Sequence, residues 1–148
     1  VFRINLIEAS ENSSYVPKIL DWATDRVNDG PIAISSSATT EELSLTQGAL
    51  GRHGAANLAD QIFGEVANGL HRLGVRKFVV AGGETSGQVI NSLGIGSLEV
   101  SCFDELGGGY CHQGGQDPIS LVLKAGALGK EDFAFTAIDR MRQAEQSQ

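Results

Sequence analysis

Six consecutive residues combine three glycines, two hydroxyls and one acid in a pattern that could bind a charged ligand. They read Gly82-Gly83-Glu84-Thr85-Ser86-Gly87 and follow the apolar run Phe78 to Ala81, which is typical of a buried strand. A helical pattern, Gln88 to Leu93, begins directly after them. The spacing therefore predicts a strand, a tight loop and a helix N-terminus.

Such a junction suits an anion. Glycines allow positive φ angles and a close approach of the backbone to a ligand, and the first N–H groups of a helix carry the positive end of its dipole. Thr85 and Ser86 can cap the helix and can also donate to phosphate oxygens. Plain turn chemistry explains the same residues, so both interpretations stay open. The glycine spacing is not that of a dinucleotide fingerprint, and no Walker A ending is present.

Two other predicted strand ends also carry polar residues. The short apolar run 32–34 leads into the hydroxyl-rich segment 35–40, for which a solvated loop is favoured over a ligand loop. The apolar run 119–123 leads into Lys124-Ala125-Gly126 and on to residue 129. The ammonium of Lys124 either neutralises a phosphate or simply extends into water. If the strands are parallel, the three loops lie at one edge of the sheet and could line one cleft.

Composition limits the class of protein. The 148 residues are 41% hydrophobic, which is enough for one core and most simply one domain. The net charge of −7 and the pI near 4.8 argue against binding to nucleic acid or to an anionic membrane, so a phosphate site must be local. We find no membrane-spanning run and no signal-peptide pattern, and we expect a cytoplasmic protein. Since the chain starts at Val1 without Met, we expect a piece of a longer protein.

The cysteines and histidines give little support for a metal site. Cys102 and Cys111, with His112 beside the second, are too few and too widely spaced for a structural zinc site, so free thiols are expected and no metal ligand is assigned. His53 and His71 lie on or near a predicted helix, where a single histidine is usually a surface or cap residue.

Strand and helix patterns alternate along the chain. Strands are predicted over 1–7, 32–34, 78–81, 97–102 and 119–123, and helices over 14–28, 55–73, 84–93 and 131–141. Residues 103–117 hold five glycines without a clear period and are predicted to be irregular, either covering a ligand or connecting elements. The alternation predicts an α/β fold, with a mostly parallel sheet, helices on both faces and three layers.

Two motifs resemble those of the four-carbon acid sugar kinases. The run from Val79 to Gly87 contains the family's Gly-Gly-Glu/Asp-Thr-Ser-Gly motif in full, and it is followed by Leu93-Gly94-Ile95. The run from Leu123 to Phe133 is similar to the family's second motif, Lys-Ser-Gly-Asn-Phe-Gly, but departs from it. Ala125 replaces the serine, and Ala127-Leu128 replace Asn-Phe, which removes a hydroxyl and an amide that could hold phosphate or metal-bound water. The likeness covers most of the chain.

The resemblance implies that residues 1–148 are the C-terminal, nucleotide-binding domain of a two-domain kinase. It implies ATP and Mg²⁺ as cofactors, with a nucleotide site built from Gly82, Gly83, Glu84, Thr85, Ser86, Gly87, Lys124 and Gly126. Glu84 would hold the metal through water, or it would only complement the helix dipole. The catalytic base and the contacts to the acid sugar are expected in an N-terminal domain, so this chain alone should not turn over.

The altered second motif keeps another function open. This alternative is a stand-alone nucleotide- or phosphate-binding module without transfer activity. A generic dinucleotide-binding domain is less favoured because the glycine spacing is wrong and no acid stands where it would hold a ribose. The partners we expect are ATP, a small acid sugar and the N-terminal domain. If apolar surface that would face that domain is exposed, a homodimer is also expected.

Overall fold

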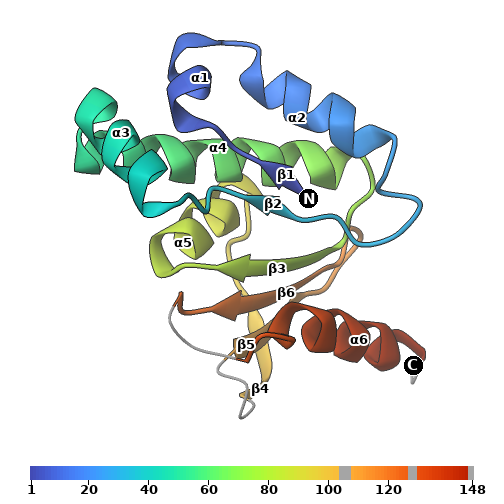
Figure 1. Cartoon of the computed structure of the whole chain (residues 1–148). Coiled ribbons are helices and arrows are strands. Elements are labelled where there is room, and N and C mark those ends of the chain that lie inside the picture. The colour runs from blue at the N-terminus through green and yellow to red at the C-terminus, as the bar shows by residue number, and fades with distance from the viewer. Residues whose placement is uncertain (104–107, 127–129, 147–148) are drawn as a thin grey trace. The chain divides into compact units, whose positions relative to one another are not determined.

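The computed structural model describes residues 1–103, 108–126 and 130–146. The chain forms two compact units, Val1–Leu73 and Gly74–Gln148. Within the described residues, the elements in chain order are β1 (Phe2–Arg3), α1 (Leu6–Glu11), α2 (Tyr15–Thr24), β2 (Ile34–Ser35), α3 (Thr40–Leu50), α4 (Arg52–Arg72), β3 (Lys77–Ala81), α5 (Gly83–Ser92), β4 (Glu99–Phe103), β5 (Gly108–Gln113), β6 (Ile119–Lys124) and α6 (Phe133–Gln146) (Figure 1). The predicted α/β class is confirmed. None of the described helices is long and apolar enough to cross a membrane.

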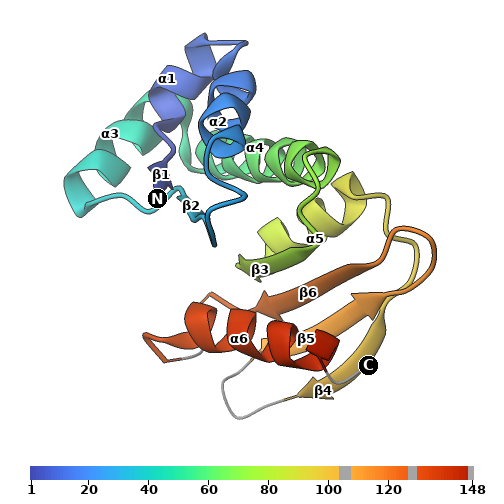
Figure 2. The same ribbon diagram turned by 90° about the vertical axis from the view of Figure 1, so that its right-hand side faces the viewer.

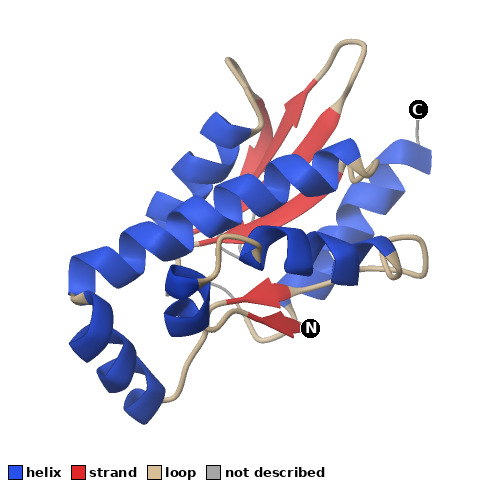
Figure 3. Ribbon diagram, turned by 90° about the horizontal axis from the view of Figure 1, so that it is seen from above, coloured by secondary structure: helices blue, strands red, loops and turns tan. Residues whose placement is uncertain are grey.

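In the unit Val1–Leu73, helices pack around a short parallel pair of strands, β1 and β2, which is drawn in red beside the N-terminus in Figure 3. The long helix α4 confirms the predicted amphipathic helix, and it contacts α2. Ile19 and Ala23 of α2 are fully buried, and Ile62 and Val66 of α4 are nearly so. The apolar spacing of three and four residues places these side chains on one face of each helix, and their burial forms the core of this unit.

The first strand is shorter than predicted. Alternation predicted a strand to Ile7, but β1 ends at Arg3 and α1 begins at Leu6. Asn5 ends the strand because it is the N-cap of α1, and its Oδ1 accepts from the N–H groups of Ile7 and Glu8 at 3.1 Å each. Local capping therefore overrides the alternating pattern.

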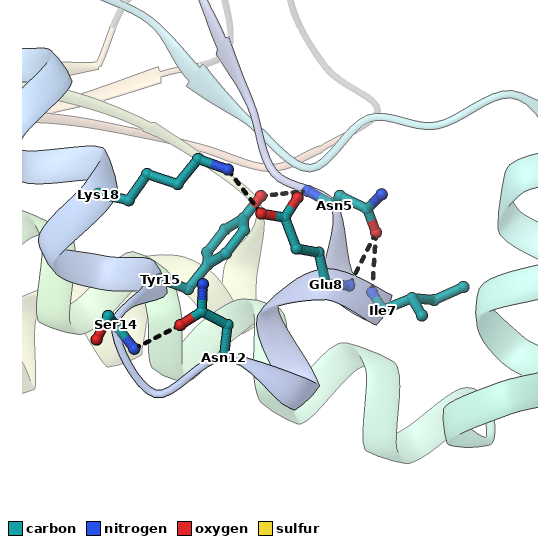
Figure 4. A network of polar contacts seen from close by, with 7 residues as sticks. All are labelled: Asn5, Ile7, Glu8, Asn12, Ser14, Tyr15 and Lys18. Carbon is teal, nitrogen blue, oxygen red and sulfur yellow. Dashed lines mark hydrogen bonds and ion pairs between the residues drawn. The ribbon is translucent and has the colours of Figure 1, made fainter.

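A buried tyrosine fixes the same turn. Tyr15 is 3% exposed, and its hydroxyl accepts the Asn5 N–H at 2.8 Å, which occupies the donor that a longer strand would use (Figure 4). Lys18 lies one turn further along α2, and its Nζ is 2.6 Å from Glu8 Oε1. The hydrogen bond to Glu8 raises the pKa of Lys18. These contacts join α1 to α2.

The larger sheet, in the unit Gly74–Gln148, is mixed. Its strand order is β3-β6-β5-β4 (Figure 2). The β3–β6 pair is parallel, as is β1–β2 in the other unit, whereas β5 runs antiparallel to both β6 and β4. The mostly parallel expectation therefore describes those two pairs, and β5 departs from it.

The prediction of an irregular segment over 103–117 is wrong for residues 108–113, which form β5. A glycine-rich run has low strand propensity and no readable period. This strand forms because its backbone pairs with β6 on one side and with β4 on the other. Residues 104–107 lie outside the described residues.

Helices cover both faces of the β3–β6 pair. Tyr110 and Val122 pack with Phe133, Ala137 and Met141 of α6 in one buried cluster. Neighbouring positions along β6 alternate between faces, and Leu121 is fully buried like Val122, so both faces of the strand are covered. Figure 1 shows α5 above and α6 below the pair, which gives the predicted three layers within this unit.

Several boundaries differ from those predicted. Helix α2 ends at Thr24 rather than near residue 28. Directly after this end, the Arg26 N–H donates to the Ala23 carbonyl, which closes a tighter turn than that of an α-helix. Strand β2 lies at 34–35 rather than 32–34, and α6 begins at Phe133 rather than 131. Helix α3 was not predicted, because its apolar residues do not form a stripe along one face. In the structure, none of its residues is buried.

Candidate functional site

The junction between β3 and α5 is built on Gly82. Its φ of +117° is disfavoured for residues with a Cβ, and a Cβ there would lie 3.1 Å from Thr85 Oγ1. The Gly82 N–H donates to the Lys124 carbonyl at 2.9 Å. The Gly82 carbonyl accepts both the N–H and the hydroxyl of Ser86, at 2.9 and 2.6 Å. Glycine at position 82 is therefore required by the backbone whether or not a ligand binds.

The first turn of α5 has no N-cap side chain. The first helical hydrogen bond is the one from Ser86, so the N–H groups of Gly83 and Glu84 precede the helical ladder. Gly83 is exposed, and a Cβ there would meet no atom within 4 Å. This helix start can therefore accept an anion at close range.

Two helix starts in the unit Val1–Leu73, those of α1 and α3, are capped by side chains, whereas those of α2 and α4 have no side-chain cap. Asn5 caps α1, and Thr39 caps α3 in a full capping box with Glu42. The Thr39 N–H donates to Glu42 Oε2 at 2.7 Å, and the Glu42 N–H donates to Thr39 Oγ1 at 3.2 Å. These side chains occupy the groups that an anion would need.

In the serine-rich segment 35–40, polar groups are also bonded within the segment itself. The Ser35 hydroxyl donates to Ser37 Oγ at 3.0 Å, and it accepts the Ser37 N–H at 3.1 Å. This pairing favours the solvated loop over the ligand loop. The segment belongs to the unit Val1–Leu73, and its place in a common cleft with the glycine loop stays a prediction.

Within the other unit, the structure brings the two remaining loops together. Ala81 and Lys124 are paired residues at the ends of the parallel strands β3 and β6. Because parallel strands end at the same edge of a sheet, the loops after them leave side by side. Gly126 is exposed beside Lys124, and residues 127–129 of the predicted loop lie outside the described residues.

The ammonium of Lys124 turns back onto its own loop. Its Nζ donates to the carbonyls of Ala125 and Gly126 at 3.0 and 2.9 Å. It also lies 5.7 Å from the ring centroid of Phe133, a distance at which a cation is attracted to an aromatic face. Phe133 is 4% exposed and belongs to the buried cluster that residues of α6 form with Tyr110 and Val122.

Two neighbours of this site were not assigned by sequence reasoning. Phe133 was quoted only as the end of a motif, and Gly108 was placed in an irregular segment. Gly108 begins β5 and pairs with Lys124. An aromatic residue at a helix start was a weak signal for Phe133, and no local signal identified Gly108, since its position depends on strand pairing.

The other predicted site residues have distinct environments. Ser86 is 8% exposed, and its hydroxyl proton is used inside α5, so it stabilises the junction rather than donating outward. Glu84 is exposed in the first turn, where a carboxylate complements the helix dipole. Gly87 is exposed one turn later.

No group of three or more metal-ligating side chains occurs in the part of the chain that the structure describes. Cys111 is a free thiol, and burial raises its pKa, which disfavours the thiolate that metals bind. His112 Nδ1 lies 3.3 Å from Ser120 Oγ. The described cysteine and histidine side chains therefore do not assemble a metal centre.

Comparison with known proteins identifies the family of this chain. The pattern of the family described as "Nucleotide-binding C-terminal domain" matches residues 2–134. A 3-oxo-tetronate kinase of Burkholderia multivorans is 38% identical over 141 residues, and one of Pseudomonas fluorescens is 34% identical over 140 residues. The alignments cover 93% and 95% of this chain but 33% and 32% of those relatives. The chain thus spans about a third of the length of the curated relatives it matches.

A solved structure has the same fold. The crystal structure of Haemophilus influenzae protein HI1011 superimposes with a TM-score of 0.82 at 28% identity. The superposition covers 93% of this chain and 34% of that one.

Proposed function

This chain belongs to the family of nucleotide-binding C-terminal domains, and on that premise we propose that it is the ATP-binding domain of a kinase for a four-carbon acid sugar. Its relatives named 3-oxo-tetronate kinase support the substrate class, and a 3-oxo-tetronate, threonate or erythronate type of acid is the proposed acceptor. The observation that carries the proposal is that the uncapped start of α5 follows Ala81, which pairs with Lys124 at the end of β6.

The residues at this edge fit a triphosphate. The N–H groups of the first turn of α5 provide donors and the dipole, and the absence of a side chain at Gly83 allows a phosphate to approach them. Thr85 adds a hydroxyl to the same turn. Ser86 and Gly82 maintain the turn through the hydrogen bonds between them. Gly87 and Gly126 are both exposed and place no side chain over this edge.

The same edge also fits a magnesium ion carried by the nucleotide. Mg²⁺ usually keeps several waters and takes one or two carboxylates together with phosphate oxygens. Glu84 is the acid of this turn, so it would bind the ion directly or through water. A bound Mg²⁺ would supply charge neutralisation to phosphoryl transfer, which depends mainly on positioning and charge.

In this proposal, the chain's own residues bind and orient the phosphates. The base and the contacts to the acid sugar are assigned to an N-terminal domain of the longer protein. Replacement of the family's serine by Ala125 supports the alternative, a nucleotide-binding module without transfer.

Calorimetric titration with a non-hydrolysable ATP analogue and Mg²⁺ tests the site through Gly83→Val. A valine side chain would fill the space that a phosphate needs but would meet no protein atom within 4 Å at its Cβ. We expect the affinity to fall at least about tenfold, which corresponds to about 1.4 kcal/mol.

Gly48→Val is the matched control. Gly48 lies in α3, it is exposed, and a Cβ there also meets nothing within 4 Å. This variant should bind the analogue like the parent. Equal affinities for the parent and Gly83→Val would move the phosphate site away from α5, and a parent that binds no analogue would contradict the proposal for this chain.

A further inference from the structure

Lys124 is the cation of the candidate site, yet its ammonium faces its own loop. Two of its three N–H donors are used by the carbonyls of Ala125 and Gly126, and the Phe133 ring lies on another side of the group. The Lys124 carbonyl also accepts the Gly82 N–H, which ties the start of this loop to the start of α5. Lys124 therefore contacts the start of α5 through its backbone and its own loop through its side chain.

The geometry of the peptide bond gives this contact a consequence. In a trans peptide, the C=O and the N–H of one unit point in opposite directions. The Ala125 carbonyl points at the ammonium, so the Gly126 N–H, in the same peptide unit, points away from it. The exposed Gly126 has no side chain to cover this N–H, and a Cβ there would meet nothing within 4 Å. The hydrogen bond from the ammonium to Ala125 thus goes with an amide donor at Gly126 that points away from the lysine.

We propose that Lys124 is a positioning residue that orients the Gly126 amide toward the nucleotide phosphates, rather than a direct phosphate ligand. Phe133 contributes by holding the ammonium over its ring. The ligand in this inference rests on the proposed function, whereas the role of the lysine in the loop does not depend on it.

The role in the loop is tested first without nucleotide, by ¹⁵N relaxation of the Gly126 amide. Lys124→Met removes both hydrogen bonds and the cation. We expect the order parameter of Gly126 to fall from about 0.85 to below about 0.6. Lys124→Gln keeps two N–H donors on a side chain that is one bond shorter, and its Gly126 order parameter should stay nearer the parent. An unchanged order parameter in Lys124→Met would overturn the proposal.

Three further variants separate charge from position. Lys130→Met removes a nearby exposed lysine and should leave the Gly126 amide as in the parent. Phe133→Leu keeps an apolar side chain in the core but removes the ring under the ammonium, and it should loosen Gly126 to an intermediate degree. Thermal unfolding of each variant shows whether the fold is intact, and Phe133→Tyr should restore the parent behaviour.

Calorimetry with the ATP analogue and Mg²⁺ gives the second readout. Lys124→Met should bind about tenfold more weakly, because the loop donor is no longer held in place, and Lys124→Gln should lose clearly less. Equal losses in the two variants would identify a direct charge contact and overturn the positioning role. If even the parent binds no analogue, the proposed function fails, while the relaxation experiment still decides the role of Lys124.

Discussion

Gly82 and Gly83 are neighbours with different roles. Gly82 is required by the fold, since its φ is +117° and a Cβ would press on Thr85. Gly83 has an ordinary backbone conformation and open space around it. Only Gly83 can therefore be replaced without strain, which makes it the informative position for a ligand test.

The capping box at α3 makes a pH-dependent contribution to stability. The Thr39 N–H, and then its hydroxyl, lower the pKa of Glu42 from its ordinary value of 4.5. A carboxyl whose pKa is lowered on folding stabilises the protein above its unfolded pKa, and the stabilisation is lost as the pH falls through the folded pKa. We expect Glu42→Gln to be less stable than the parent at pH 7, with the difference shrinking as the pH falls below the ordinary carboxyl pKa of 4.5 and through the lowered folded pKa. Urea unfolding at several pH values measures this.

The control for that experiment is Glu41→Gln. It removes the neighbouring acid from the same turn and leaves the capping box in place. An equal loss of stability at pH 7 in both variants would contradict the prediction, because it would assign the effect to the charge of the first turn rather than to the box.

Helix starts divide into two kinds in this protein. The capping side chains of Asn5 and Thr39 precede helices α1 and α3. Helix α5 instead has Gly82 as its N-cap, which has no side chain to cap the first turn. The first kind is complete without a ligand. The starts of α2 and α4 also lack a side-chain cap, so the candidate site is placed at α5 because Ala81, just before it, pairs with Lys124.

Two helix glycines should respond to alanine in opposite ways. Gly48 in α3 has open space around a Cβ, so Gly48→Ala should stabilise the protein by about 0.5–1 kcal/mol. At Gly69 in α4, a Cβ would lie 2.5 Å from Leu20 Cδ1, at the contact between α4 and α2. Gly69→Ala should therefore destabilise by about 1–3 kcal/mol in spite of the same gain in helix propensity. Chemical unfolding of both variants measures the difference.

Leu20→Ala provides the check on that pair. Combined with Gly69→Ala, it removes the clash, so the double variant should be more stable than the sum of the two single changes predicts. Strict additivity would show that Leu20 is not the cause.

The prediction of individual elements was most accurate where one period extended over many residues. Helix α4 follows a regular apolar spacing and was predicted nearly to its ends. The alternation at the N-terminus was too short to predict that Asn5 would cap a helix, and α3 has no apolar stripe to find. Strand β5 had no signal because its glycines carry neither a period nor a propensity.

At the level of the whole molecule, the chain is about a third of the length of its kinase relatives. We expect the 148-residue chain alone to give no phosphoryl transfer, because the base and acid-sugar contacts are assigned to the N-terminal domain. The longer protein should phosphorylate 3-oxo-tetronate in the presence of ATP and Mg²⁺. A coupled assay of ADP release, with threonate and erythronate as alternative acceptors, measures both.

Gly83→Val in the longer protein serves as the control for nucleotide use. It should reduce ADP release, whereas Gly48→Val should not. Transfer by the isolated chain would contradict the assignment of the base. A longer protein that binds ATP but releases no ADP with any of the three acids would favour the module without transfer. The homodimer expected from the sequence stays a prediction.

Local spacing was enough to predict the α/β class, the strand before Gly82, the glycine junction and α4, because each depends on residues within a few positions of one another. The pairing of Ala81 with Lys124, the antiparallel course of β5 and the contact of Lys124 with Phe133 were evident only in the folded chain. These contacts join residues from separate elements. Local propensity does not determine which strand a given strand will pair with, or which side chain a given side chain will contact. The glycine loop was thus readable as a motif, while its place beside Lys124 came from the tertiary structure.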